Sequence, residues 1–285
     1  MRLERKSKLP PQSLAAMQFT LSLTAVTLYL SATFVAATHF KKLAAGAESD
    51  KGLLLSLWGF ALLLHGAVLS QRVLTPHGVN LAFFNALSIV AALVVAIVWV
   101  TAIKRPVENL AFVVLPTAAL CLTLDQVTPT HLVIAAPAES ALEIHILISL
   151  IAYSLLTIAA LQSLVLAVQD WQLHHHRPGG IMRALPPLQW MEHLLFQLIA
   201  VGFVLLTLAL ITGFAFLQNI FAQHLVHKTV LSIVAWAVFA VLLLGRWRFG
   251  WRGHTAIRWT LGGFFVLMLA YFGSKMVLEL VLHRT

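Results

Sequence analysis

Histidine is the residue type with the clearest chemical potential in this 285-residue sequence, which contains 13 of them. The neutral imidazole nitrogen is a good ligand for iron, zinc or copper at ambient pH. Cys121 is the single cysteine, which excludes an intrachain disulfide, a Cys-x-x-Cys redox pair and a Cys-x-x-Cys-His covalent haem site. No phosphate-binding glycine loop, His-Glu-x-x-His helix or nucleophile elbow occurs. The residues therefore indicate ligand binding and not enzymatic catalysis.

His65 lies in an apolar stretch, 53–69, that holds no other ionisable group. A polar residue inside a bilayer costs roughly 2–3 kcal/mol unless it faces a partner or a wet cavity. We therefore expect His65 to face the interior of a helix bundle and favour a functional role, as a ligand or proton relay, over a purely structural one. The adjacent Gly66 would let a ligand or another helix approach closely.

Four further histidines are candidates for a binding site at the outer ends of helices. His145 opens an apolar helix, where it is either a ligand or an interfacial polar cap. His224 and His227 are three residues apart and share one helix face, as a ligand pair or as ordinary loop residues. His283 lies near the end of the last helix. Three consecutive histidines, 174–176, resemble a metal-binding tract, but we expect them to belong to a solvated cytoplasmic loop.

The elements that must position these histidines are membrane-spanning helices. Hydrophobic residues make up 60% of the chain and charged residues 10%, well below the roughly 25% charged of a soluble domain. Each helix needs about 20 apolar residues to cross the bilayer, and the period-2 pattern of a membrane barrel is absent. We expect an all-α bundle over 1–285, a single domain without a soluble part. The predicted spans are about 14–37, 53–69, 81–103, 110–124, 144–168, 194–217, 225–244 and 257–282.

Loop charges predict the orientation of these helices, because cytoplasmic loops carry an excess of Lys and Arg. With the first helix starting outside, eleven basic residues fall inside and four outside, if the N-terminal tail is not counted. The inside set is Lys41, Lys42, Lys51, Lys104, Arg105, Arg177, Arg183, Arg246, Arg248, Arg252 and Arg258. We therefore place both termini on the extracytoplasmic side of a bacterial inner membrane.

The basic tail, 1–16, carries four more basic residues and is the one conflict with this orientation. Either Met17 is the native start or so short a tail is tolerated. The net charge of +9 fits basic cytoplasmic loops beside the anionic lipid bilayer, or a protein partner bound there. It does not indicate nucleic acid.

The C-terminal part of the sequence resembles the cytochrome c assembly family of membrane proteins, which includes CcsA, ResC and HemX, and is most similar to its YpjD branch. The resemblance is strongest over 145–285, where the segment from His145 to Ser154 resembles the histidine-containing helix start of the family. The matching runs are Met191-Glu192, Val201 to Thr207, Thr212-Gly213, Lys228 to Trp236, Gly250-Trp251-Arg252-Gly253 and Tyr271-Phe272-Gly273-Ser274.

This resemblance implies haem as the cofactor, held at the outer face by histidines. His145 corresponds to the first outer histidine of the family, and His283 lies close to the position of the second. Two departures affect haem presentation. The segment 218–228 lacks the tryptophans of the family, and Leu244 replaces an intramembrane histidine.

The leading hypothesis is a non-enzymatic haem-binding or haem-handling membrane protein, with His145 and His283 as metal ligands and His65, His224 and His227 as further site residues. A HemX-like regulator or scaffold, acting through its basic loops on haem synthesis or a membrane complex, is the first alternative. A small-solute or metal transporter is the second. His65 and the Lys275/Glu279 pair favour the transporter, because intramembrane charges mark transport paths.

Overall fold

The computed structural model describes residues 11–75, 78–128, 133–135, 140–175, 184–216, 223–273 and 276. For 11–15, 74, 133–135, 140–141, 216 and 223–225 it describes the backbone alone. The elements are α1 (Pro11–Ala44), α2 (Gly52–Val73), β1 (Leu74–Thr75), β2 (Gly78–Asn80), α3 (Phe83–Lys104), η1 (Glu108–Leu110), α4 (Ala111–Val127), β3 (Val133–Ala135), α5 (Ser140–His174), α6 (Leu188–Phe216), α7 (Gln223–Phe249), α8 (Gly253–Met268) and η3 (Leu269–Gly273).

All eight predicted spans are confirmed as helices long and apolar enough to cross a membrane. Several helices continue beyond the apolar stretch: α1 reaches Ala44 and α5 reaches His174, while α6 already begins at Leu188. Apolarity marks only the part inside the hydrocarbon, whereas helical hydrogen bonding continues into the interface. The predicted end of the eighth span, at 282, lies outside the described residues.

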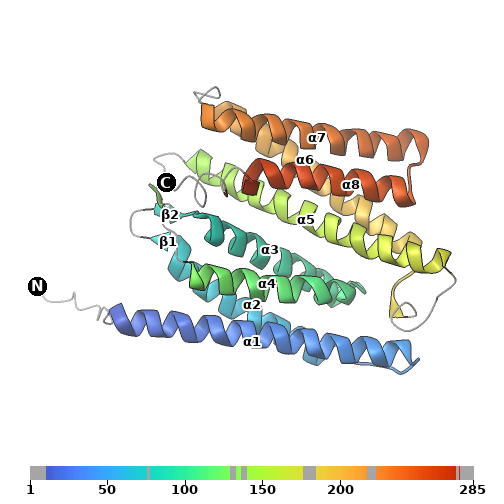
Figure 1. The fold of residues 1–285 in the computed structure, drawn as a ribbon, viewed down its shortest axis with the longest axis horizontal. Coiled ribbons are helices and arrows are strands. Elements are labelled where there is room, and N and C mark those ends of the chain that lie inside the picture. Colours follow the sequence, from blue (N-terminus) through green and yellow to red (C-terminus); the bar gives the residue numbers. More distant parts are fainter. Residues whose placement is uncertain are drawn as a thin grey trace, which may run out of the picture.

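The helices run back and forth along one direction, so that their connections gather at two ends (Figure 1). Helices α1 to α4 pack together as one group and α5 to α8 as a second group. Contacts of α3 with α5 join the two groups. The loops predicted to be cytoplasmic lie at one end, called here the loop end, while β1 and β2 lie at the other, called here the strand end. Which end faces the cytoplasm stays a prediction.

A small antiparallel sheet at the strand end was not predicted from the sequence. Strand β2 pairs with β1 through Thr75 and Gly78, and with β3 through Val79 and Ile134. Strands of two or three residues are too short to show a period-2 pattern, so the sequence offers no signal for them.

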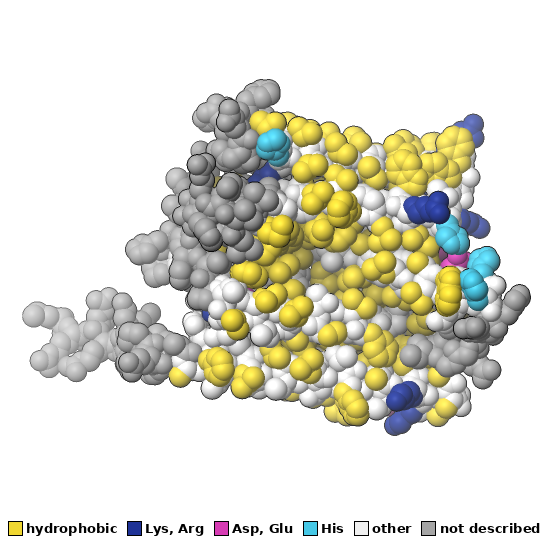
Figure 2. Space-filling model, viewed as in Figure 1, with side chains coloured by type: hydrophobic (Ala, Val, Ile, Leu, Met, Phe, Trp, Pro, Cys, Tyr) yellow, Lys and Arg dark blue, Asp and Glu magenta, His cyan; other side chains and the backbone are white. Residues whose placement is uncertain are grey.

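The sides of the bundle are apolar, as a lipid-facing surface must be. Hydrophobic side chains cover the visible side, and the Lys, Arg, Asp and Glu side chains in view gather near the ends (Figure 2). Phe34 is 71% exposed and Leu63 is 70% exposed. Such a surface would drive a soluble protein to associate, whereas in a bilayer it is solvated by lipid tails.

Candidate functional site

His145 lies near the strand end of α5, in contact with α6. Its Nδ1 is 2.9 Å from the hydroxyl oxygen of Thr212. That hydroxyl has one proton, which it donates to the backbone oxygen of Leu208 at 2.8 Å. With that proton donated to Leu208, Thr212 can only accept from His145, so this arrangement corresponds to the tautomer in which Nδ1 carries the proton. In this tautomer the lone pair of the neutral ring is on Nε2, which is the arrangement that a metal-binding histidine requires.

Gly213 permits this close contact between the His145 ring and α6. A Cβ atom added at Gly213 would lie 3.1 Å from Cε1 of His145, closer than ordinary van der Waals contact. Any larger residue there would push the ring away from its bond with Thr212. The Thr212-Gly213 pair and His145 were singled out separately in the sequence, and the structure brings them together in one contact.

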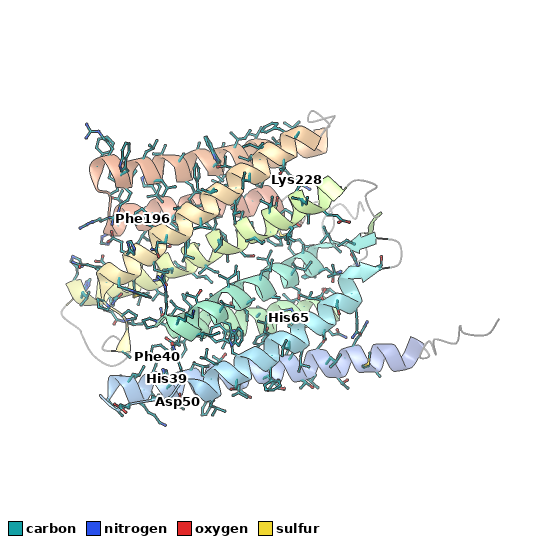
Figure 3. All side chains as sticks on the ribbon, turned by 180° about the vertical axis from the view of Figure 1, so that it is seen from behind. His39, Phe40, Asp50, His65, Phe196 and Lys228 are labelled. Atoms are coloured by element: carbon teal, nitrogen blue, oxygen red, sulfur yellow. The ribbon has the colours of Figure 1, made fainter. Side chains whose placement is uncertain are left out.

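His65 faces the interior of the bundle, as expected, and is fully buried. Its Nδ1 is 3.2 Å from the hydroxyl of Tyr29 on α1, and its Nε2 is 2.9 Å from the hydroxyl of Ser88 on α3. The three side chains, called here the His65 clamp, therefore join three helices. His65 itself lies near the middle of the bundle (Figure 3). A metal could bind His65 only if the ring gave up one of these bonds.

The expected role of Gly66 beside His65 is wrong. Gly66 is exposed, and a Cβ atom added there would meet no described atom within 4 Å. The glycine lies on the side of α2 that faces away from the bundle, so neither a helix nor a ligand held inside the bundle approaches it. His65 makes its contacts through the opposite side of the helix.

The remaining candidate histidines are placed only in part. His227 is exposed on the first turns of α7, at the strand end. The backbone of His224 belongs to α7, while its side chain lies outside the described residues, as do His283 and the Lys275/Glu279 pair. Within the described residues no group of three or more His, Cys, Asp or Glu side chains could hold a metal ion. The pairing of His145 with His283 stays a prediction.

Ion pairs between helices were not predicted from the sequence, which shows the individual charged residues but not their partners. At the strand end Arg72 of α2 pairs with Asp125 of α4 at 2.8 Å, and Asp125 is only 2% exposed. At the loop end Lys51 pairs with Glu108 at 2.8 Å and also donates to the backbone oxygen of Ala102. The partners are more than 50 residues apart in sequence, so no local spacing rule could pair them.

A second charged cluster at the loop end unites residues that carried the family resemblance. Glu192 of α6 accepts a hydrogen bond from Arg246 at 2.7 Å, and Arg252 lies 3.7 Å away. The Trp251 ring packs directly on Gly245, where no Cβ atom could fit, because the added atom would be 2.3 Å from the ring. This cluster, composed of Glu192, Arg246, Trp251 and Arg252, fixes the turn between α7 and α8 against α6. Three carboxylates, those of Glu108, Asp125 and Glu192, are therefore paired with Lys or Arg side chains.

Comparison with known proteins identifies the relatives of this chain. Residues 53–282 match the family described as Cytochrome C assembly protein. The chain is 35% identical to the Inner membrane protein YpjD of Escherichia coli over 223 residues, which cover 78% of this chain and 84% of that protein.

More distant relatives match about half of the chain. The Cytochrome c biogenesis protein CcsA of Chlamydomonas reinhardtii is 24% identical over 158 residues, covering 53% of this chain and 44% of that protein. Protein HemX of Brevibacillus brevis is 21% identical over 148 residues, covering 51% of this chain and 54% of that protein. No solved structure matches the chain.

The family match covers most of the chain and includes both His65 and His145, whereas the resemblance predicted from the sequence was strongest over 145–285. With eight candidate spans and a relative named as an inner membrane protein, this is a multi-pass inner membrane protein. The chain belongs to the Cytochrome C assembly protein family.

Proposed function

We propose that the protein binds haem at the strand end of the bundle, with His145 as an axial ligand, and handles haem without catalysing a reaction on it. Membership of the cytochrome c assembly family supports a haem-related function in the membrane. The observation that carries the proposal is the contact between His145 Nδ1 and the Thr212 hydroxyl, because a proton held on Nδ1 by this hydroxyl would leave the Nε2 lone pair available to coordinate iron.

Further histidines near this end of the bundle are the candidates for the second axial ligand. Bis-histidine ligation needs a second imidazole, and His227 lies at the same end while His224 belongs to the first turn of the same helix. His283 is the second ligand that the family resemblance favours. Haem would supply an iron able to accept two imidazole nitrogens. The chain itself orients His145 through Thr212 and admits its ring beside Gly213.

The His65 clamp is a separate feature from this site. His65 lies in the middle of α2 and both its ring nitrogens are engaged by Tyr29 and Ser88. We infer that His65 supports the site by holding α1, α2 and α3 together, or relays a proton along its two hydroxyl partners. Direct iron ligation by His65 is the weaker assignment, because it would leave one of two buried hydroxyls without a partner.

Absorbance spectroscopy of the purified protein tests the proposal. The full chain is produced with haem supplementation, purified in dodecyl maltoside and scanned before and after reduction with dithionite. We expect a Soret band that shifts on reduction in the wild type and is lost or shifted in His145→Ala. His193→Ala is the matched control, because His193 is an exposed histidine at the opposite end of α6 and its replacement should leave the spectrum unchanged.

A HemX-like regulatory or scaffolding role is the second candidate. The basic loop end favours it, because Arg248 and Arg252 are exposed there and could contact a soluble partner. A protein that stays colourless after haem supplementation would contradict haem binding and support this role. An unchanged spectrum in His145→Ala would instead move the ligand assignment to His224 or His227.

A further inference from the structure

A cavity of about 400 Å³ lies where the two groups of helices meet, between α3, α4, α5 and α8. This volume is in the range of small-molecule sites, about 300–1,000 Å³. Its wall is almost wholly apolar. Lining residues Leu269 and Met276 are 37% and 46% exposed, so the cavity opens onto the lipid-facing surface. Representative lining residues are Phe83, Val90, Cys121, Tyr153, Phe264 and Phe272.

Tyr153 is the buried hydroxyl-bearing residue among the described residues of this wall. Its side chain is nine-tenths buried, with 8% of the residue exposed, yet its hydroxyl makes no hydrogen bond to any residue that the structure describes. Buried tyrosine hydroxyls normally have a partner, as the hydroxyl of Tyr29 does in the His65 clamp. The hydroxyl of Thr117, also in the cavity wall, is unbonded within the described part of the chain as well. Tyr153 therefore places one buried hydroxyl beside the cavity, and no residue that the structure describes supplies its acceptor.

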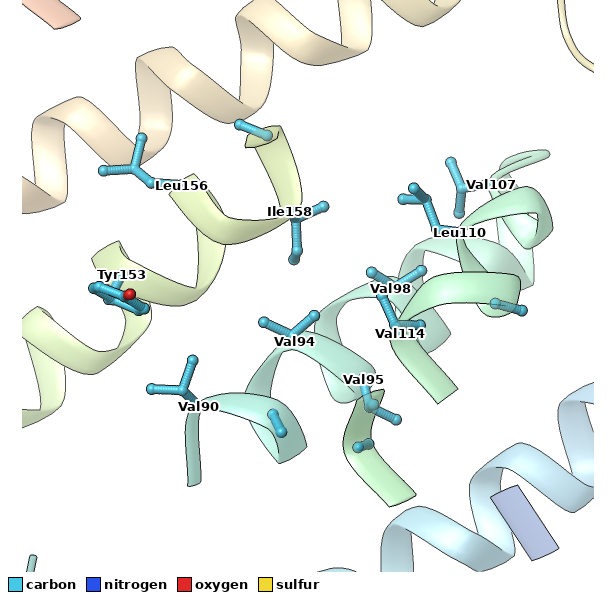
Figure 4. Packing of buried hydrophobic residues seen from close by; sticks show 14 of the residues in the cluster. Val90, Val94, Val95, Val98, Val107, Leu110, Val114, Tyr153, Leu156 and Ile158 are labelled. Carbon is cyan, nitrogen blue, oxygen red and sulfur yellow. The ribbon is translucent and has the colours of Figure 1, made fainter. Parts of the chain in front are cut away.

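Aromatic rings surround the same tyrosine. The Tyr153 ring centroid is 5.8 Å from that of Phe264 and 5.4 Å from that of Phe272, and Phe83 lies 5.6 Å from Phe272. Val90 of α3 lies across from Tyr153 of α5 in Figure 4. A flat ring inserted among these side chains would gain edge-to-face and offset stacking contacts. The wall is thus suited to a planar molecule.

The depth of Tyr153 restricts which molecule could supply the acceptor. Tyr153 is five residues from the middle of the span Leu142–His174, which is roughly 8 Å from the midplane of a hydrocarbon core about 30 Å thick. Ester carbonyls of phospholipids lie at the interface, about 15 Å from the midplane. A carbonyl that reaches Tyr153 must therefore belong to a molecule dissolved entirely in the hydrocarbon.

The wall does not fit haem. Among the residues described, neither a histidine nor a cationic side chain lines the cavity, so a haem there would lack an imidazole ligand and its two carboxylates would be unpaired in hydrocarbon. The backbone beside the cavity forms one turn of π-helix, Leu269–Gly273, a feature that often marks functional sites.

We propose that this cavity binds a lipid-soluble quinone, a planar ring with carbonyl oxygens and an apolar tail, and that Tyr153 donates a hydrogen bond to one carbonyl. The ring lies among Phe83, Phe264 and Phe272, and the tail leaves beside Leu269 and Met276 into the bilayer. This site is distinct from the haem site proposed at His145, which faces α6, and does not depend on it.

Binding of decylubiquinone to the full chain in dodecyl maltoside tests the proposal. Quenching of tryptophan fluorescence gives the affinity, and the rise in unfolding temperature gives an independent measure. Decylbenzene, which has a ring and a tail but no carbonyl, is the comparison ligand. We expect decylubiquinone to bind more tightly than decylbenzene, and Tyr153→Phe to weaken decylubiquinone alone by about fivefold, the loss of one neutral hydrogen bond.

Two matched pairs of variants complete the test. Ala91→Phe places a ring in the cavity wall and should abolish binding, whereas Val100→Phe adds the same ring to a lipid-facing position of α3 that is 60% exposed and should not. Tyr29→Phe and His145→Ala should both bind decylubiquinone normally. If Ala91→Phe does not fold, judged by its unfolding temperature, Tyr153→Phe decides alone.

Three results would overturn the proposal. Equal affinities for decylubiquinone and decylbenzene would show that the cavity takes any hydrocarbon. Unchanged decylubiquinone binding by Tyr153→Phe would show that Tyr153 donates no hydrogen bond to the quinone. Competition between haemin and decylubiquinone in the wild type, together with loss of haemin binding in Ala91→Phe, would identify the cavity as a haem site.

Discussion

The His65 clamp predicts a specific cost for breaking the contact between α1, α2 and α3. His65→Leu removes two interhelical hydrogen bonds, to Tyr29 and Ser88, and keeps a side chain of similar size. Measured interhelical hydrogen bonds in membrane proteins contribute about 0.6 kcal/mol on average and up to about 1.7. We therefore expect His65→Leu to lower the free energy of unfolding by about 1–3 kcal/mol.

A double-mutant cycle isolates the bond between Tyr29 and His65. Unfolding by SDS in mixed micelles, followed by circular dichroism, gives the free energy for the wild type, Tyr29→Phe, His65→Leu and the double variant. Because the two side chains touch, we expect a coupling energy of about 0.6–1.7 kcal/mol. Ser70→Ala is the control, since its hydroxyl is exposed and bonds only to its own helix at Ala67, and it should change stability by less than about 0.5 kcal/mol.

His65→Gln distinguishes a structural role of His65 from a role in metal ligation or proton relay. An amide has both a donor and an acceptor, so this variant should recover part of the stability lost in His65→Leu. If His65 ligates a metal or relays protons, His65→Gln should still lose function while its expression stays normal; full activity would return His65 to a structural role. Additive free energies in the cycle, with no coupling between Tyr29 and His65, would refute the clamp itself.

Three further predictions concern other parts of the molecule. Gly213→Val should displace the ring of His145, because even a Cβ would lie 3.1 Å from Cε1, and should weaken the Soret band in the haem-supplemented protein; a wild-type spectrum would contradict the contact. Arg72→Met should destabilise the protein by about 3–5 kcal/mol, since it leaves the buried carboxylate of Asp125 unpaired, and Arg72→Met with Asp125→Asn should recover much of this loss in the same unfolding assay. A reporter active only in the cytoplasm should be silent when fused after Thr285, and strong activity would reverse the predicted orientation.

The sequence predicted the membrane helices well because their signal is local. About 20 consecutive apolar residues identify a span without reference to any other part of the chain, and all eight were found. Helix ends were predicted less well, as at Leu188 and Ala44, because hydrogen bonding of the backbone does not stop where apolarity does. The family was also readable from short motifs, and the wider match confirms it.

For the candidate site, the sequence identified the histidines that could act as ligands but did not predict which residues they contact. His65 could be predicted to face the interior, because one buried imidazole in a long apolar stretch must find a polar neighbour. That these neighbours are Tyr29 and Ser88 could not be predicted, since they belong to other helices. For His145 the tautomer depends on a hydroxyl 67 residues away.

Taken alone, the sequence determined the class of protein, the number of spans and the membership of a family, since composition and short motifs are properties of the chain itself. Only the tertiary structure decided which charges pair, which hydroxyl groups contact the histidine rings and where a cavity lies. Arg72 meets Asp125, and Glu192 meets Arg246, because helices far apart in sequence pack side by side. The physical reason is that span formation depends on local apolarity, whereas interhelical contacts depend on helix packing, which no single segment encodes.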